Sequence, residues 1–216
     1  MHIIRTLPQT VYVALSGGID SVVLFHFLRK KYNVIAVHHV HDNEYAQKEL
    51  EFVEELCNKT NTDLLVNKVN LVKNPKDSKE EAWRKSRYEY FRQVDGTVCT
   101  GHTLDDMVEW YLFTAMHGEG RFMEYAHANV VRPFICTKKE EIIDFANKNN
   151  ISWLEDPSNL DINFAVRNRI RHEILPSALL VNPGLYKTVK TKFLKKLQRQ
   201  LSTNLKENNV SGKISI

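Results

Sequence analysis

Short apolar runs alternate with amphipathic stretches along the first half of the chain. The apolar runs are rich in β-branched residues and predict strands at Val11–Leu15, Val34–His38, Leu64–Val66 and Thr97–Thr100. Apolar residues at helical spacing between and after these runs predict helices over Ser21–Lys31, Glu44–Asn58, Glu80–Gln93 and Asp105–Met116. This alternation predicts an α/β fold with a doubly wound, mostly parallel sheet that is covered by helices on both faces.

The pattern changes after Arg132 and Pro133. We expect a helix over Lys138–Asn149 with Thr137 as its N-cap, and then an arginine-rich helix over Asn163–Ile174. From Asn182 onward a basic helix carries an apolar stripe, made of Val189, Phe193, Leu197 and Leu201. We therefore divide the chain into a core at residues 1–135, its continuation with a loop and an arginine-rich helix at 136–182, and a C-terminal helical extension at 183–216.

The composition adds limits on the class of protein. With 216 residues, 43% hydrophobic and 26% charged, the chain resembles a globular protein with one ample core. No apolar run is long enough to cross a bilayer and the N-terminus lacks a signal-peptide pattern, so we expect a cytoplasmic protein without a membrane partner. Cys57, Cys99 and Cys136 lie far apart, which argues against a zinc ribbon, an iron–sulfur cluster or a disulfide framework.

The net charge of +4 is modest, but positive charge gathers near the C-terminus. Between residues 187 and 213 the single acid, Glu207, is outnumbered by basic residues. These are Lys187, Lys190, Lys192, Lys195, Lys196, Arg199, Lys206 and Lys213. Such a segment suits a polyanion such as RNA, and the alternative is a solvated helix face.

The first candidate site is the glycine-containing loop between the first strand and the first helix. Its residues are Ser16, Gly17, Gly18, Ile19, Asp20 and Ser21. Two adjacent glycines allow a tight turn that points backbone N–H groups toward one ligand, and the following helix adds its positive end, so the loop predicts a pyrophosphate cradle. It is not a Walker A loop, because no GK[ST] follows. Asp20 fits an anion site if Mg²⁺ bridges it to phosphate oxygens; a structural turn is the alternative.

The second candidate site follows the fourth strand, at Gly101 and His102. Asp106 and Glu109 are three residues apart and share one face of the predicted helix, so they favour a site for an ammonium group, a metal ion or both. Helix capping is the alternative for the acids, because carboxylates are favoured in a first turn. His102 lies at a strand end, where it could hydrogen-bond a phosphate or a nucleobase.

A third polar segment lies at Glu155–Asp161 and is followed by Arg167, Arg169 and Arg171. A polar loop followed by arginines suits contacts to phosphates or to a carboxylate. The alternative is an exposed loop and a salt-bridged helix.

These segments, in this order, resemble the tRNA(Ile)-lysidine synthetase family. The matching blocks are SGGIDS at Ser16–Ser21, EEAWRKSRYEYF at Glu80–Phe91, GHTLDDMVE at Gly101–Glu109, RPF at Arg132–Phe134, EDPSNLD at Glu155–Asp161 and RNRIR at Arg167–Arg171. SGGxDS alone is shared with the wider PP-loop group, which includes enzymes similar to GMP synthetase, NAD synthetase and tRNA thiolases. The downstream blocks distinguish the resemblance to the lysidine synthetase family from a resemblance to this wider group.

The resemblance implies a PP-loop ATP-pyrophosphatase fold, similar to adenine nucleotide α-hydrolases, for residues 1–135. It implies that ATP adenylates C2 of the wobble cytidine in a CAU-anticodon isoleucine tRNA, and that free L-lysine then displaces AMP. The residues implied to bind ATP are Ser16, Gly17, Gly18, Ile19, Asp20, Ser21, His41, Gly101 and His102. Asp20 would hold Mg²⁺, Asp106 and Glu109 would receive the amines of lysine, and Arg167 would pair with its carboxylate.

Two departures and three alternatives accompany this resemblance. The run after His41 is polar and acidic, where the family usually has a Gly-Leu-Arg-like sequence. The chain is also too short for the C-terminal tRNA-binding domains of larger members, so the basic segment or a homodimer would have to grip the tRNA. The alternatives are a tRNA thiolase, a small-molecule amidotransferase, and an RNA-binding relative without catalysis.

Overall fold

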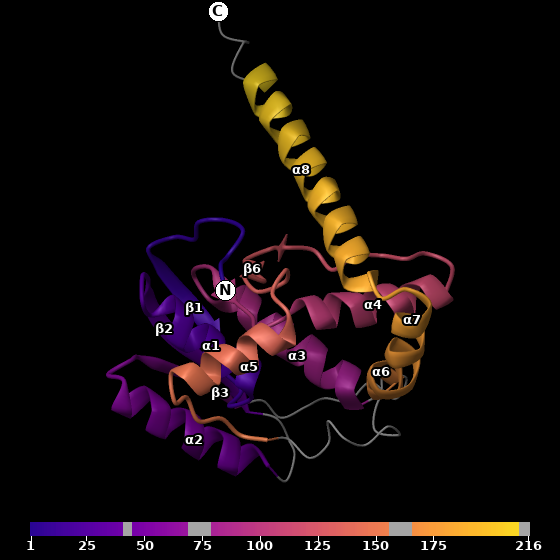
Figure 1. Ribbon diagram of the computed structural model, residues 1–216. Helices are drawn as coiled ribbons and strands as arrows, with labels where there is room; N and C mark the ends of the chain where they lie inside the picture. Colours follow the sequence, from indigo (N-terminus) through magenta and orange to yellow (C-terminus); the bar gives the residue numbers. More distant parts are fainter. Residues whose placement is uncertain (41–44, 69–78, 156–165, 212–216) are drawn as a thin grey trace, which may run out of the picture.

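The computed structural model describes residues 1–40, 45–68, 79–155 and 166–211, with side chains described over 1–40, 45–68, 81–155 and 166–203. Six strands form one sheet, and helices surround it (Figure 1). The strands are β1 Thr10–Ala14, β2 Asn33–Val40, β3 Leu64–Lys68, β4 Val98–Cys99, β5 Ala126–His127 and β6 Val130–Val131. The helices are α1 Ile19–Leu28, α2 Ala46–Lys59, α3 Lys79–Gln93, α4 Leu104–Met116, α5 Lys139–Lys148, α6 Val166–Arg169, η2 Ile170–Ile174, α7 Leu175–Val181 and α8 Leu185–Ser211.

The strand order β3-β2-β1-β4-β6-β5 confirms the predicted fold class. All neighbouring pairs are parallel except the β5–β6 pair at the edge, which is antiparallel. From β1 the chain moves outward to β2 and β3, and then returns to the other side of β1 at β4. Parallel sheets bind ligands at the carboxyl ends of the strands where the direction of winding reverses. This position lies between β1 and β4, and the loops after these two strands contain Ser16–Ser21 and Gly101–His102.

Alternating side chains of β1 explain how the sheet is covered on both faces. Val11, Val13 and Leu15 lie in a buried cluster with apolar residues of α1, α2 and α5. Tyr12 and Ala14 point to the other face, against a cluster that includes apolar residues of α3. A strand that is buried on both sides is uniformly apolar, which is why β1 was readable from its sequence.

The C-terminal helix α8 packs its first turns on the core and then extends away from it (Figure 1). Its apolar stripe begins with Leu185, Val189 and Phe193, which are buried together with Met107 and Val108 of α4. The stripe predicted from helical spacing is therefore confirmed where it is buried. Among the described residues, no helix combines the length and the apolar character needed to span a bilayer.

The structure differs from the sequence prediction at two places. The short strands β5 and β6 were not expected, because two-residue strands leave no periodic signal. Thr137 is not the N-cap of α5; Lys138 occupies that position, and its backbone N–H donates to Glu141 Oε1 over 3.2 Å. Thr137 is buried, and its carbonyl accepts the N–H of Leu104 instead. The three-part division of the chain stays a prediction.

Candidate active site

The loop between β1 and α1 is shaped by its two glycines. Gly17 has a φ of +87°, in the region that favours glycine, and a Cβ there would lie 3.0 Å from Leu154 Cδ1. Gly18 is the N-cap of α1, but it supplies no side-chain hydrogen bond to the first turn. The first N–H groups of a helix have no intrahelical acceptor, and the helix dipole makes that end positive. The geometry of the loop is therefore compatible with a backbone site for an anion, and the binding itself stays a prediction.

The two serines of this loop hold its shape. Ser21 Oγ donates to the Gly18 carbonyl over 2.8 Å, and the backbone N–H of Ser16 donates to Ser21 Oγ over 3.2 Å. The two hydroxyl oxygens lie 3.2 Å apart. Ser21 is buried beneath the loop, while Ser16 is exposed. The buried serine thus braces the turn, and the exposed one is available to a ligand.

Gly101 brings the loop after β4 against the first turn of α1. A Cβ at Gly101 would lie 2.9 Å from the carbonyl carbon of Asp20, and 3.0 Å from both the Asp20 carbonyl oxygen and the Ser21 nitrogen. Side chains do not tolerate contacts this close to backbone atoms, so only glycine fits. The two loops at the reversal point of the sheet are consequently in direct contact.

Asp20 is held by a lysine that the sequence did not indicate. Lys139 Nζ lies 2.7 Å from each carboxylate oxygen of Asp20. The backbone N–H of the same residue donates to Asp105 Oδ2 over 2.7 Å, which caps the N-terminus of α5. Asp105 Oδ1 also accepts the hydroxyl of Tyr186 over 2.8 Å. Lys139 therefore links the loop after β1 to the first turn of α4.

Glu109 lies at the centre of a cluster of acids and arginines. Its side chain is 2% exposed, and it accepts Arg167 Nε at 2.7 Å and Arg171 Nε at 2.6 Å. Arg167 also pairs with Asp106 through Nη2. Burial raises the pKa of Glu109, and the charge and hydrogen bonds of Arg171 oppose this rise. The carboxylate thus depends on its guanidinium partners to stay ionised.

Asp106 serves two purposes at once. Its Oδ2 accepts the backbone N–H of Thr103 at 2.5 Å and the Thr103 hydroxyl at 3.0 Å, while its own N–H donates to Thr103 Oγ1. This is a reciprocal capping box at the start of α4. The other oxygen, Oδ1, faces Arg167. The capping interpretation of Asp106 is therefore confirmed for one oxygen, whereas the other oxygen pairs with an arginine of the chain itself, and the site for an ammonium group or a metal ion stays a prediction.

His102 lies in the loop after β4, next to Gly101, and is partly buried. Its Nδ1 is 2.9 Å from the Thr100 hydroxyl. Burial lowers the pKa of His102 well below its ordinary value, and the charges of Arg132, Arg167 and Arg87 lower it further. The imidazole is consequently neutral at physiological pH. A neutral ring surrounded by guanidinium groups is suited to hydrogen-bond a nucleotide whose phosphates are attracted by those groups.

The arginines of the site come from a segment with an irregular turn. Arg167 is in α6, and Arg171 is in the π-helical turn η2 that follows directly. Both guanidinium groups reach Glu109 across about sixty residues of sequence. Single π-turns occur often at functional sites, because they change the direction of side chains along a helix.

The structure brings together most of the residues that the sequence singled out. Asp20, Gly101, His102, Asp106, Glu109 and Arg167 gather at the reversal point of the sheet. Their pairing differs from the expected one: Arg167 faces the two acids that were expected to receive amines. His41 and the predicted loop residues from Asp156 to Asp161 lie outside the described residues. Lys139 and Tyr186 were missed, since neither belongs to a recognisable motif.

The residues around Asp20 fit a magnesium ion. Mg²⁺ in phosphate-transfer sites is commonly held by one or two carboxylates together with phosphate oxygens and water. The Asp20 side chain is 34% exposed, and its two oxygens already face a cation, the Lys139 ammonium. No group of three or more metal-binding side chains occurs within the described ranges. Asp20 is thus the residue that would hold the ion, and Mg²⁺ at this place stays a prediction.

The three cysteines are free thiols that lie apart from one another and are buried. Burial raises the pKa of Cys57 and of Cys136 to about 11, and that of Cys99 to about 12. Thiols with such pKa values are poor nucleophiles and poor metal ligands at neutral pH, because the thiolate is the reactive form.

The glycine loop at a helix N-terminus, opposed by a second loop across the reversal point of the sheet, defines a PP-loop nucleotide site. A family model described as a PP-loop domain matches residues 3–178. The chain belongs to this PP-loop family.

Curated relatives carry a more specific name. The chain is 31% identical to the tRNA(Ile)-lysidine synthase of Lactiplantibacillus plantarum, over 91% of this chain and 47% of the relative. It is 30% identical to the enzyme of the same name from Thermotoga maritima, over 94% of this chain and 54% of the relative. The chain thus spans about half the length of the curated relatives it matches.

Solved structures show the same fold at low identity. The U34-tRNA thiolase NcsA from Methanococcus maripaludis, with its [4Fe-4S] cluster, has a TM-score of 0.66 and 16% identity, over 89% of this chain and 74% of the other. The NH3-dependent NAD synthetase from Campylobacter jejuni has a TM-score of 0.50 and 17% identity, over 88% of this chain and 86% of the other. These similarities concern the fold alone.

Proposed function

We propose that the chain uses ATP to attach lysine to C2 of the wobble cytidine in a CAU-anticodon isoleucine tRNA, which forms lysidine. One observation carries the proposal: Lys139 joins the glycine loop at Asp20 to Asp105 in the first turn of α4, the residue next to Asp106 of the acid–arginine cluster. A nucleotide and an amino acid bound at these two places would meet at one edge of the sheet. The names of the relatives supply the substrate class.

In the first step, the C2 oxygen of cytidine attacks the α-phosphorus of ATP and pyrophosphate leaves. Negative charge grows on the departing pyrophosphate. The N–H groups at Gly18 and the first turn of α1, with the dipole of that helix, stabilise this charge. Mg²⁺ held at Asp20 would neutralise further charge on the phosphate oxygens. The Lys139 ammonium beside Asp20 supplies positive charge from the protein itself.

In the second step, an amine of lysine attacks C2, the C2–O bond breaks and AMP leaves. The attacking amine must lose a proton, and a carboxylate beside it can accept that proton. We place the amine at Asp106 Oδ1, where a guanidinium already shows that a cation is favourable. Arg167 would then turn to the lysine carboxylate, for which its planar fork is well matched. Arg171 would keep Glu109 ionised.

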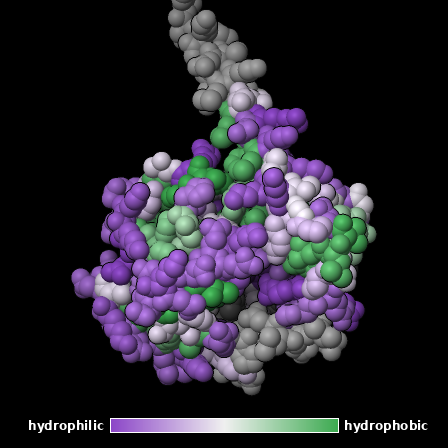
Figure 2. Space-filling view, in the orientation of Figure 1, coloured by the Kyte–Doolittle hydropathy of each residue, from purple (hydrophilic) through white to green (hydrophobic). Residues whose placement is uncertain are grey.

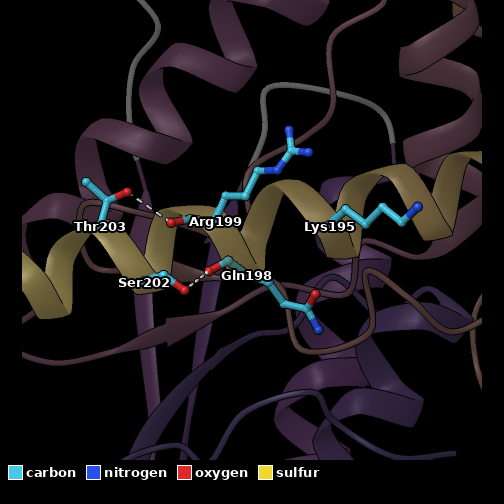
Figure 3. A pocket seen from close by; sticks show the side chains of 5 residues that line it. All are labelled: Lys195, Gln198, Arg199, Ser202 and Thr203. Carbon is cyan, nitrogen blue, oxygen red and sulfur yellow. Dashed lines mark hydrogen bonds between the residues drawn. The ribbon is translucent and has the colours of Figure 1, made fainter.

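The α8 helix offers a cationic surface for the tRNA backbone. Figure 3 shows Lys195 and Arg199 extending from one side of this helix. The hydroxyls of Ser202 and Thr203, beside them, donate to carbonyls of the same helix, at Gln198 and Arg199. The charged groups of this side are therefore the two long basic side chains. Such groups bind phosphates without reading sequence.

Thiolase activity is less well supported by the residues of this chain. Cys57, Cys99 and Cys136 are buried apart from one another, and their raised pKa values oppose thiolate chemistry. The likeness to the thiolase NcsA is one of fold.

The direct test is transfer of radiolabelled lysine from solution into a CAU-anticodon isoleucine tRNA by the purified chain with ATP and Mg²⁺. We expect label in the tRNA, with AMP and pyrophosphate released in equal amounts. A transcript with a UAU anticodon lacks the cytidine and serves as the control, and Asp106→Asn should abolish transfer. Equal sustained AMP release with lysine omitted would contradict the proposal.

A further inference from the structure

An aromatic stripe runs along α4 from the acid–arginine cluster. Trp110, Phe113 and His117 follow Asp106 at intervals of four, three and four residues, which places these side chains on one side of the helix. The ring centroids of Trp110 and Phe113 lie 5.7 Å apart, with the planes inclined by 31°. Those of Phe113 and His117 lie 4.5 Å apart, inclined by 46°. The rings form one surface that begins a single turn beyond the Asp106 carboxylate.

The stripe faces away from the apolar core. The opposite side of α4 packs in the buried cluster with α8 through Met107 and Val108. Within the described residues, none of the three rings of the stripe belongs to a buried cluster. Trp110 is 37% exposed, and His117 is also exposed at the end of the helix. Phe113, between them, is half-buried. A row of rings that is exposed at both ends and belongs to no buried cluster marks a binding surface.

The last ring is fixed in orientation. His117 Nδ1–H donates to the Phe113 carbonyl over 2.7 Å, which holds the imidazole against the Phe113 ring. A ring that is held in place before binding loses little conformational freedom when a ligand stacks on it. The stripe is therefore preorganised at the end that lies farthest from Asp106.

We propose that Trp110, Phe113 and His117 form a stacking platform for the unpaired RNA bases beside the cytidine that is modified. This inference rests on the proposed function, because it takes the base that the amine at Asp106 attacks to be the cytidine of an RNA loop. Unpaired bases are commonly bound by stacking on aromatic side chains, and every base has a face that can stack. A loop whose target base enters the site at Asp106 leaves its neighbouring bases over the next turns of α4.

The charges at the two ends of the stripe favour RNA over an apolar protein segment. Arg167 lies at one end, where it pairs with Asp106, and the exposed Arg169 follows it in α6. At the other end, the backbone N–H of Arg121 donates to Thr114 Oγ1, which places this exposed arginine beside the last turn of α4, where its guanidinium pairs with Glu119. These arginines are paired with acids of the chain itself, and a guanidinium can exchange a carboxylate for a phosphate of RNA, a partner that an apolar protein segment does not offer.

The test is a double-mutant cycle between the protein and the RNA. The variant is Trp110→Leu, which keeps an apolar side chain but removes the ring, and its partner is a full-length tRNA with an abasic nucleotide next to the wobble cytidine. We expect each change alone to weaken binding about 10-fold and the two together to weaken it little further, because both remove the same stacking contact. Trp110→Phe should restore most of the affinity.

Two controls separate stacking from other effects. The slope of log affinity against log salt should stay unchanged in Trp110→Leu, since stacking releases no counterions. Leu180→Ala removes a more exposed apolar side chain from α7, 86% exposed, and should leave tRNA binding unchanged. Unchanged affinity in Trp110→Leu, or additive effects of the protein and RNA changes, would overturn the platform.

The platform and the proposed function fail in different ways. If the wild-type chain transfers lysine and Trp110→Leu does so with an unaltered KM for tRNA, the platform is wrong and the proposed function stands. If the wild-type chain transfers no lysine while Trp110→Leu still loses affinity for the RNA in the cycle, the proposed reaction is wrong and the platform stands.

Discussion

The loop after β1 presents backbone atoms, whereas the cluster on α4 is built from charged side chains of separate helical segments. In the loop, Gly17 and Gly18 set the geometry over a few consecutive residues. In the cluster, Glu109 meets Arg167 and Arg171 from a segment about sixty residues away. The loop, which we call the backbone half of the site, is therefore a local structure with little to rearrange. The cluster, which we call the charged half of the site, is a tertiary structure whose charges depend on one another.

This difference predicts how each half responds to change. A backbone site fails when an added atom displaces it, and it is insensitive to pH. A buried ion cluster fails when one charge is removed, because the remaining charge is left without compensation in a poorly solvated place. Lys139 connects the two regions, since its side chain contacts Asp20 of the loop and its backbone contacts Asp105, the neighbour of Asp106 in the cluster.

The largest effect is expected from Gly101→Ala. The new Cβ would lie 2.9 Å from the Asp20 carbonyl carbon, so the two loops must separate. A displacement of about 1 Å at reacting groups costs roughly 100-fold in rate. We expect lysine-dependent AMP formation to fall by about that factor in a steady-state assay.

Gly18→Ala is the matched change in the same half. Gly18 has a φ of −70°, and a Cβ there would lie no closer than 3.7 Å to a neighbouring atom, Ser16 Oγ. We expect the free energy of unfolding to change by less than about 0.5 kcal/mol. Wild-type turnover in Gly101→Ala would show that the contact between the loops is dispensable.

Arg171→Met should be the largest stability change in the charged half. It leaves the buried Glu109 with fewer positive partners, and we expect a loss of about 2 kcal/mol in urea unfolding at pH 7, at the low end for a broken buried pair because Arg171 is partly exposed. Removing Arg171 raises the pKa of Glu109 further above its unfolded value. Stability from such a group is present at low pH and lost as the pH rises through the folded pKa.

The deficit of Arg171→Met should therefore shrink when the unfolding experiment is repeated at pH 5, where protonated Glu109 needs no cation. Arg169→Met is the control, because Arg169 lies in the same segment with an exposed side chain, 3.7 Å from Glu173. It should cost less than about 0.5 kcal/mol at both pH values. A deficit that grows at pH 5 would mean that Glu109 is not the partner that matters.

Lys139→Met tests the link between the halves. Its ion pair with Asp20 is more than one-third exposed, so we expect less than about 1 kcal/mol of lost stability. The substitution removes the ammonium group beside the glycine loop, where we propose that the phosphates of ATP bind. The KM for ATP should therefore rise about tenfold, which is the expected effect of losing one charge-assisted contact. The KM for lysine should stay unchanged, and a rise in both would show that the halves are coupled more tightly than the contacts indicate.

The smallest effect is expected on α8, which lies apart from both halves. Replacing Lys195, Lys196 and Arg199 together by Gln should weaken tRNA binding only several-fold at low salt, and should reduce the salt slope by about 2 to 3. The KM values for ATP and lysine should not change. Lys59→Gln, on the exposed side of α2, is the control. An unaltered slope would make α8 a structural helix alone.

Much of the fold could be predicted because its signals are local. The four pairs of a strand and the helix that follows it, from β1–α1 to β4–α4, were predicted within a few residues of their observed positions. Buried parallel strands and amphipathic helices differ in the spacing of their apolar residues, which makes both recognisable in a sequence. The β5–β6 pair could not be found in this way. Its strands are two residues long, and they are paired by their place beside β4 rather than by their own sequence.

The candidate site, too, could be predicted in part: its residues were recognised from local signals, but the contacts between them were not. Asp20, Asp106, Glu109 and Arg167 were singled out by residue type and motif. Their pairing was not, because contacts such as Lys139 with Asp20 join residues 119 positions apart. The aromatic residues of α4 stand at helical spacing in the sequence. Only the burial of the opposite side of the helix and the exposure of Trp110 show that they face away from the core.

The sequence by itself determined a glycine turn at a strand-to-helix junction and two acids on one helix face, since both follow from backbone geometry within a few residues. The tertiary structure decided that Gly101 must be a glycine, that Lys139 reaches Asp20, and that Glu109 is buried between two arginines. The physical reason is that contact and burial depend on which distant elements the sheet places side by side, and charge and pKa depend on contact and burial.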